Sequence, residues 1–130
     1  MDKPTLLKQF RLAGIPRLMK AKLAFARDGT AVVRLPARRE FLQSTNVVHG
    51  AIITFAADTS AYFTAAAASK RPVTTASFSL NLLRPVKASS GLRSTSVIVK
   101  NGRTLVIVRS QVWNDDGDLA AEGLWTHAVV

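Results

Sequence analysis

The sequence contains no cysteine, and only two of its 130 residues are histidines, His49 and His127. Without cysteine there can be no disulfide framework, no thiolate metal site and no cysteine nucleophile. Two histidines are too few for a histidine-rich metal site within one chain. We therefore expect neither kind of metal site within one chain. The first ten residues, MDKPTLLKQF, also lack the apolar core of a secretory signal, which predicts a cytoplasmic protein.

Acidic residues are scarce. Eight Asp and Glu stand against 18 Lys and Arg, so the formal net charge is +10 and the sequence pI is about 11.2. Such a charge attracts nucleic acid, anionic lipid or a phosphorylated small molecule. No run of consecutive Lys and Arg exceeds two, and aromatic residues do not alternate with them as in an RNA-recognition motif. No specific nucleic-acid partner is predicted, and a solvated basic surface is the simpler interpretation.

Apolar residues make up 48% of the chain, which is ample for one hydrophobic core, and the length favours a single domain over residues 1–130. Residues 1–21 predict an N-terminal helical segment with a loose apolar stripe. Residues 22–35 predict two strands joined by Asp28-Gly29, a dipeptide typical of hairpin turns.

The longest apolar stretch is residues 47–69, which is rich in Ala and is followed by Lys70, Arg71 and Pro72. This pattern predicts a central buried helix that ends before the proline. Asp58 in its middle, with Ser and Thr around it, argues against a membrane span. A carboxylate in such a segment is costly unless it is paired or used, so Asp58 is the first candidate functional residue.

Four further strands are predicted after this helix, over residues 73–83, 92–100, 103–113 and 119–129, with Asn-Gly and Asp-Gly turns between the last three. Simple alternation places Phe78 and Leu80 on one face of the first of these strands and Thr75 on the other. The predicted fold class is α+β, an antiparallel sheet of about six strands curled around one long central helix. One helix covers only one face of this sheet, which leaves the other face or the edges for solvent or a second subunit.

Three stretches now suggest a family: VVHGAIITFAADTSAYF, VTTASFSLNLLRPV and KNGRTLVIVRSQVWNDDGDLAAEG. From about Val32 to the end, the chain resembles the hotdog-fold acyl-CoA thioesterases of the phenylacetate-pathway (PaaI-like) type. The most specific part is a His-Gly pair that opens the helix, with an Asp nine residues after the His. The resemblance implies a hotdog fold and a hydrolase whose substrate carries coenzyme A, with no other cofactor.

The resemblance also implies roles for single residues. The family glycine whose backbone N–H holds the thioester oxygen matches Gly50, and the acidic base or nucleophile matches Asp58. The histidine beside the glycine matches His49, and the Ser or Thr that helps to hold the attacking water matches Thr75. Relatives often have Asn where this chain has Gln43, and their His-Gly-Gly is His-Gly-Ala here.

Each of these residues has a simpler alternative. Asp58 could be a structural carboxylate bonded to Ser or Thr or paired with Arg. His49 could be a hydrogen-bonding residue at the helix start, Thr75 an ordinary strand residue, and His127 a plain sheet residue.

The spacing of Gly50 and Asp58 in the sequence bears on how many chains form the site. Gly50 and Asp58 are eight residues apart on one predicted helix, which separates them by ~12 Å. A general base must reach within about 3 Å of its target, or act through one water. One chain therefore cannot supply both groups, but two antiparallel helices can, so we expect a homodimer or a dimer of dimers (homotetramer). His49 and Asp58 lie on opposite sides of the helix, which excludes a His-Asp dyad within one chain.

The substrate side is less specified by the sequence. Candidate residues for the acyl pocket are Phe55, Thr59, Tyr62 and Phe63, and candidate contacts for the phosphates of coenzyme A are Arg84, Lys87, Lys100 and Arg103. Aryl and aliphatic acyl groups suit this pocket equally. The alternatives to a thioesterase are a non-catalytic acyl-CoA-binding protein of the same fold and, ranked below it, a basic nucleic-acid-binding domain.

Overall fold

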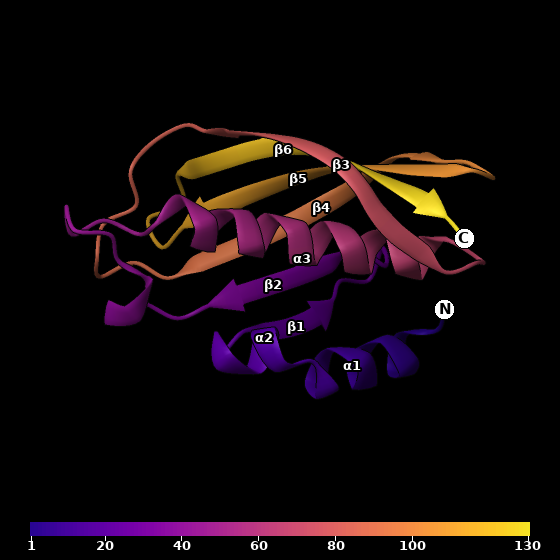
Figure 1. Cartoon of the computed structure of the whole chain (residues 1–130), viewed down its shortest axis with the longest axis horizontal. Helices are drawn as coiled ribbons and strands as arrows, with labels where there is room; N and C mark the ends of the chain where they lie inside the picture. Colours follow the sequence, from indigo (N-terminus) through magenta and orange to yellow (C-terminus); the bar gives the residue numbers. More distant parts are fainter.

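The computed structural model describes residues 1–130, and its centre is helix α3 (Gly50–Ala68), which lies lengthwise against an antiparallel sheet (Figure 1). The sheet has six strands: β1 (Lys22–Phe25), β2 (Ala31–Leu35), β3 (Val73–Leu82), β4 (Leu92–Asn101), β5 (Leu105–Asn114) and β6 (Leu119–Val129). The predicted α+β class, the strand pattern and the central helix are confirmed. None of the helices combines the length and the hydropathy that crossing a bilayer requires.

The strand order in the sheet is β1-β2-β4-β5-β6-β3. Strands β4, β5 and β6 follow one another as hairpins, and Gly117 takes a positive φ of 83° in the predicted Asp-Gly turn. The strands on either side of α3 in the sequence join opposite sides of this meander, β2 beside β4 and β3 beside β6. The two edges of the sheet are therefore β1 and β3.

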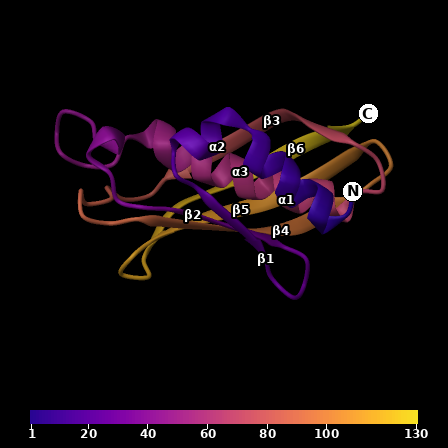
Figure 2. The same ribbon diagram turned by 90° about the horizontal axis from the view of Figure 1, so that it is seen from below.

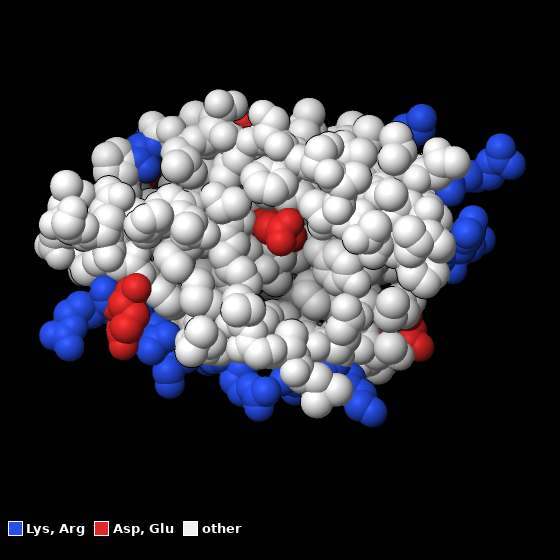
Figure 3. All heavy atoms as spheres, in the orientation of Figure 1, with Lys and Arg blue, Asp and Glu red and all other residues white.

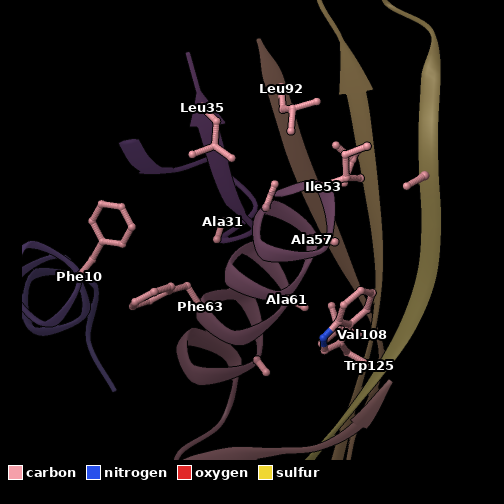
Figure 4. Close-up of a cluster of buried hydrophobic side chains, with 14 of the residues drawn as sticks. Phe10, Ala31, Leu35, Ile53, Ala57, Ala61, Phe63, Leu92, Val108 and Trp125 are labelled. Atoms are coloured by element: carbon pink, nitrogen blue, oxygen red, sulfur yellow. The ribbon is translucent and has the colours of Figure 1, made fainter. Parts of the chain in front are cut away.

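Small side chains allow α3 to lie close to the sheet. Ala56, Ala57 and Ala61 are fully buried on its inner side, where Ala57 and Ala61 lie near Val108 and Trp125 (Figure 4). Apolar residues of the inner sheet face, among them Val106 and Val108, complete this part of the core. The weak apolarity of alanine is thus compensated by a close helix-to-sheet contact.

A buried polar cluster also joins α3 to the sheet, made of Ser60 on the helix and Ser94, Ser96 and Ser110 on β4 and β5. The Oγ of Ser60 lies 2.6 Å from that of Ser94 and 2.8 Å from that of Ser96. Ser110 donates to the carbonyl of Ala57 at 2.8 Å. Because each hydroxyl has a partner, burying the cluster is tolerated, and its directional bonds fix the position of the helix on the sheet.

The N-terminal segment forms α1 (Lys3–Leu12) and α2 (Gly14–Leu18), as predicted for residues 1–21. Seen from below, both helices lie over α3 (Figure 2). Phe10 of α1 meets Phe63 of α3 edge to face, with ring centroids 5.7 Å apart. This contact places Phe63 in the core, so its prediction as a residue of the acyl pocket was wrong.

The helix boundaries differ slightly from the sequence-based range 47–69. Helix α3 begins at Gly50, because Val47 and Val48 form isolated β-bridges with Lys87 and Leu42. A short 3-10 helix, η1 (Arg39–Phe41), precedes these bridges. The extended segment before Gly50 matters for the site, because it decides which backbone N–H groups of α3 are free.

Candidate active site

His49 is the N-cap of α3, and its side chain decides which backbone amides of the first turn are occupied. Its Nδ1 accepts a hydrogen bond of 3.0 Å from the Ala51 N–H, and its carbonyl accepts one of 2.9 Å from the Ile52 N–H. The Gly50 N–H has no partner within the chain. The first turn of α3 thus presents one free donor, at the position where the sequence predicts the oxyanion contact.

The cap also fixes the state of the His49 ring. A nitrogen that accepts a hydrogen bond carries no proton, so Nδ1 is the unprotonated ring nitrogen in this cap. This geometry supports the helix-start alternative for His49. The side chain positions the first turn rather than facing Asp58, which is nine residues along the helix.

Gly50 lines an open cavity of about 340 Å³ together with Gln43, Leu82 and Arg84. A Cβ at position 50 would lie 2.9 Å from Leu82 Cδ1, so a side chain there would crowd this end of the cavity. The amide of Gln43 is exposed and donates to Thr45 Oγ1 at 3.0 Å. Gln43 and Gly50 therefore line the same cavity, although the Gln43 amide is engaged locally.

Asp58 is half-buried at the middle of α3 and is the only charged residue of that helix. Its Oδ1 accepts a hydrogen bond of 2.8 Å from Trp125 Nε1, while Oδ2 has no partner in the chain. No cation lies within salt-bridge distance. Figure 3 shows one isolated acidic group amid an uncharged surface, over the position that α3 occupies in Figure 1. Neither structural alternative for Asp58, a Ser or Thr bond or an Arg pair, is present.

The partner of Asp58 was not predicted. Trp125 is fully buried in β6, and its ring stacks on Phe78 of β3 with centroids 4.8 Å apart and planes 5° apart. One sequence signal could have found it, because a buried indole N–H and a carboxylate in an apolar segment each need a hydrogen-bond partner.

Thr75 lies on the side of the sheet that faces α3. A β-bulge between Thr75 and Ser77 shifts the register, so that Thr75 pairs with His127 and Phe78 pairs with Trp125. Directly paired residues share a face, so Thr75 lies on the same face as Phe78. The simple alternation that separated them was wrong, and the bulge is the reason. Thr75 is exposed on this edge strand.

His127 was predicted to be a plain sheet residue, but it is fully buried and neither ring nitrogen has a hydrogen-bond partner. Burial lowers the pKa of His127 below its ordinary value, and the nearby carbonyl of Val106 and the charge of Asp58 oppose this effect only in part. Its ring lies 6.4 Å from that of Tyr62. The side chain is thus a buried polar group without a hydrogen-bond partner, near Tyr62 of the helix face that carries Asp58.

Two of the predicted acyl-pocket residues share the helix face of Asp58. Phe55, Asp58 and Tyr62 follow the i, i+3, i+7 spacing of one face, and both aromatic residues are half-buried. The Tyr62 hydroxyl accepts a hydrogen bond of 3.0 Å from Gln9 Nε2. Thr59 is turned away, because it is buried and donates to the Phe55 carbonyl at 2.7 Å.

The four predicted phosphate contacts divide between the two ends of α3. At its N-terminal end, Arg84 pairs with Asp118 at 3.6 Å and Lys87 with Asp116 at 3.2 Å. Lys100 and Arg103 flank Asn101, which donates to the carbonyl of the last helical residue, Ala68. Arg103 also lines a cavity of about 360 Å³ with Lys70 and Arg71. Within one chain these residues therefore form two separate basic clusters.

Helix α3 is continuous from Gly50 to Ala68, so Gly50 and Asp58 lie eight residues apart on a single helix. The corresponding separation is about 12 Å. One chain does not bring the free amide and the carboxylate together. No group of three or more His, Asp and Glu side chains is arranged to hold a metal ion.

The sequence model of the thioesterase superfamily matches residues 45–121, which is more than half of the chain and includes Gly50, Asp58 and Thr75. The chain belongs to the thioesterase superfamily. Membership supports thioester hydrolysis as the general activity. No curated protein matches the sequence.

Solved structures of other proteins have the same fold. The PaaI protein of the phenylacetic acid degradation operon of E. coli superposes with a TM-score of 0.87, at 15% identity over 95% of this chain and 88% of that one. A Haemophilus influenzae thioesterase superposes with a TM-score of 0.88, at 16% identity over 100% of this chain and 91% of that one. For a mutant of the phenylacetic acid degradation protein PaaI of Thermus thermophilus, the TM-score is 0.82 and the identity is 22%, over 89% of this chain and 98% of that one. The predicted hotdog fold and the PaaI-like resemblance are confirmed.

Proposed function

We propose that this thioesterase hydrolyses an acyl-CoA or aryl-CoA thioester to the free acid and coenzyme A, in a site shared between two antiparallel copies of α3. The observation that carries the proposal is the pair of unpartnered groups on that helix, the Gly50 N–H at its start and Asp58 Oδ2 at its middle. One suits a developing oxyanion and the other suits the proton of an attacking water.

In the proposed reaction, the thioester carbonyl oxygen accepts a hydrogen bond from Gly50 of one protomer. Asp58 Oδ2 of the other protomer takes a proton from a water molecule, whose oxygen attacks the carbonyl carbon. The tetrahedral intermediate then collapses, the C–S bond breaks, and the proton passes to the leaving sulfur. In the alternative course Asp58 attacks directly and water cleaves the resulting anhydride.

The surroundings support this use of Asp58. Trp125 donates to Oδ1, which leaves Oδ2 as the free oxygen and restricts rotation of the carboxylate. Thr75 lies on the same side of the sheet as Trp125, where its hydroxyl can hold the water. Phe55 and Tyr62 flank Asp58 on its helix face and are suited to the acyl group. Arg84 and Lys87 lie at the end of α3 that carries Gly50, where they are suited to the phosphates of coenzyme A.

The proposed dimer is supported by the edge strand β3. Its outer edge has no partner strand, and Phe78, Leu82 and Leu83 are about half exposed there. The surface around α3 and β3 in Figure 3 is largely uncharged, although the protein is strongly basic. An unpaired edge with apolar side chains favours association with a second copy.

The first test is a thiol-release assay over a panel of acyl-CoA and aryl-CoA esters. Asp58→Asn keeps the shape of the side chain and removes the base, so it should lower turnover at least ~100-fold while fold and oligomeric state are retained. Near-wild-type turnover of this variant would assign Asp58 a structural role. Acyl-CoA binding without turnover by the wild type would instead favour the ligand-binding alternative.

The second test concerns the shared site and mixes Asp58→Asn chains with Gly50→Pro chains. Proline removes the free N–H without breaking a bond within the chain, and the φ of −64° and ψ of 138° at His49 suit the residue before a proline. Each homodimer should be inactive. With random pairing at equal mixing, activity should return to about a quarter of wild type. Verified heterodimers that remain inactive, although both variants fold, would contradict the shared site.

A further inference from the structure

Three aliphatic side chains point into solvent where α1 meets α2. Leu12, Ile15 and Leu18 are 69%, 58% and 69% exposed, while Leu6 and Phe10 of the same segment are buried in the core. A single exposed leucine is ordinary, but three large aliphatic side chains within seven residues are not required by the packing of this fold.

Basic residues lie close to these aliphatic residues in the sequence. Between residues 8 and 22 the chain has five Lys and Arg and no acidic residue. None of the five forms a salt bridge within the chain. Figure 3 shows Lys and Arg gathered along the lower edge of the molecule, where Figure 1 places α1, α2 and β1. We call this surface the basic elbow: Lys8, Arg11, Leu12, Ile15, Arg17, Leu18, Lys20, Lys22 and Arg34.

Three of these cations converge without a counter-charge. Lys20, Lys22 and Arg34 line an open cavity of about 400 Å³ beside Leu35 and Pro36. Lys22 and Arg34 are directly paired across β1 and β2. Like charges in directly opposed positions of an antiparallel pair are destabilising, and an anion between them relieves the repulsion. The cavity is therefore suited to a phosphate group.

The neighbouring aliphatic residues decide between a dissolved anion and a surface. A free phosphate would neutralise the cations but would leave Leu12, Ile15 and Leu18 in water. An anionic bilayer satisfies both parts, because its phosphates meet the cations and its acyl region accepts the aliphatic side chains. Neither α1 nor α2 is long enough to cross a membrane, so the elbow would lie in the interface.

The position of the basic elbow is compatible with the proposed dimer. The elbow includes β1, whereas the proposed subunit contact uses β3, the strand at the opposite edge of the sheet. We propose that the basic elbow docks this protein on an anionic phospholipid surface. The proposal does not depend on the identity of the substrate.

The electrostatic part is tested by sedimentation with phosphatidylcholine vesicles that contain or lack phosphatidylglycerol. The wild type should bind only the anionic vesicles, and added salt should weaken the binding. The double variant Lys20→Gln/Lys22→Gln should bind on the order of twentyfold more weakly. The matched control Lys70→Gln/Arg71→Gln removes the same charge at two exposed positions at the other end of α3, and should bind like the wild type.

The apolar part is tested with Leu12→Ser/Leu18→Ser, which should weaken binding to anionic vesicles by about tenfold or more. Its matched control is Val97→Ser/Leu124→Ser, which changes two exposed residues on β4 and β6 and should leave vesicle binding unchanged. Circular dichroism checks that every variant is folded. The proposal is overturned if the wild type does not bind anionic vesicles, or if each control variant loses as much binding as its test variant.

Discussion

A single hydrogen bond determines which oxygen of Asp58 is available. The indole of Trp125 occupies Oδ1 and leaves Oδ2 free, so the two oxygens of one carboxylate have different surroundings. The sequence predicts Asp58 because a charge in an apolar helix stands out. It indicates that Asp58 and a buried indole each need a hydrogen-bond partner, but it does not pair Asp58 with Trp125, because this contact depends on the rotation of α3 and on the register of β6 against β3, which are tertiary properties.

Trp125→Phe tests this bond. Phenylalanine keeps an aromatic ring against Phe78 but removes the indole N–H together with the volume of the second ring, so kcat should fall about tenfold with little change in KM. The matched control is Trp113→Phe, because the indole of Trp113 donates to Thr95 and has no contact with Asp58. Equal kinetic effects in both variants, or no effect in either, would show that Trp125 does not position the carboxylate.

His127 should make the stability of the protein depend on pH. Its lowered pKa in the folded state means that the unfolded chain binds the proton more tightly. The free energy of unfolding should therefore fall as the pH decreases below about 6.5, where the unfolded histidine becomes protonated. His127→Leu should remove this contribution and be more stable than the wild type by about 1–2 kcal/mol at low pH.

Urea denaturation at a series of pH values measures the effect. The control is His49→Asn, which removes the other histidine and keeps a favourable N-cap. If His127→Leu retains the full pH dependence and His49→Asn loses it, the assignment to His127 is wrong.

At the scale of elements, the sequence predicts the strands well, because hairpin dipeptides and alternation are local signals. Its errors occur where a tertiary contact overrides the local pattern. The bridges of Val47 and Val48 shorten α3, and the bulge after Thr75 reverses one face assignment. Phe63 lies in the core because α1 covers its side of α3. None of these contacts can be recognised from the type of the residue concerned or from its neighbours in the sequence.

The four-serine cluster between α3 and the sheet gives a prediction at this scale. Ser60→Ala should reduce the free energy of unfolding by about 2 kcal/mol, because Ser94 and Ser96 each lose their closer hydrogen-bond partner in a buried site and keep only Ser110. Changing all four serines to alanine should recover much of that loss, since no unpaired hydroxyl remains. Chemical denaturation measures both variants. Ser79→Ala, at an exposed position, is the control. This account would be contradicted if the quadruple variant lost more free energy of unfolding than the four single variants lose in total.

At the scale of the whole molecule, charge is unevenly distributed. On the face shown in Figure 3, the surface around α3 and β3 is nearly uncharged, whereas Lys and Arg appear around its margin, among them the lower edge that carries the basic elbow. The sequence gives the net charge but not this separation, because Lys and Arg are spread along the chain and only the fold sorts them.

The basic groups near the ends of α3 should affect substrate choice. CoA esters should be cleaved with a higher kcat/KM than the matching pantetheine esters, which lack the nucleotide phosphates, and the difference should shrink as salt screens the charges. Steady-state kinetics with both ester series at low and high salt measure this preference. Equal efficiency at low salt would mean that the positive charge serves another purpose.

The strand order has a consequence for the chain while it is being synthesised. Strand β3 ends at Leu82, but the strand that pairs with it, β6, begins only at Leu119. At about 5–20 residues per second, several seconds pass before β6 has been made. During this interval β3 lacks β6, its one neighbour in the finished sheet, and Phe78 lacks the indole on which it later stacks. The same strand from another nascent chain is then its nearest competitor, so misassembly during translation should occur mainly at the edge that we propose as the subunit contact.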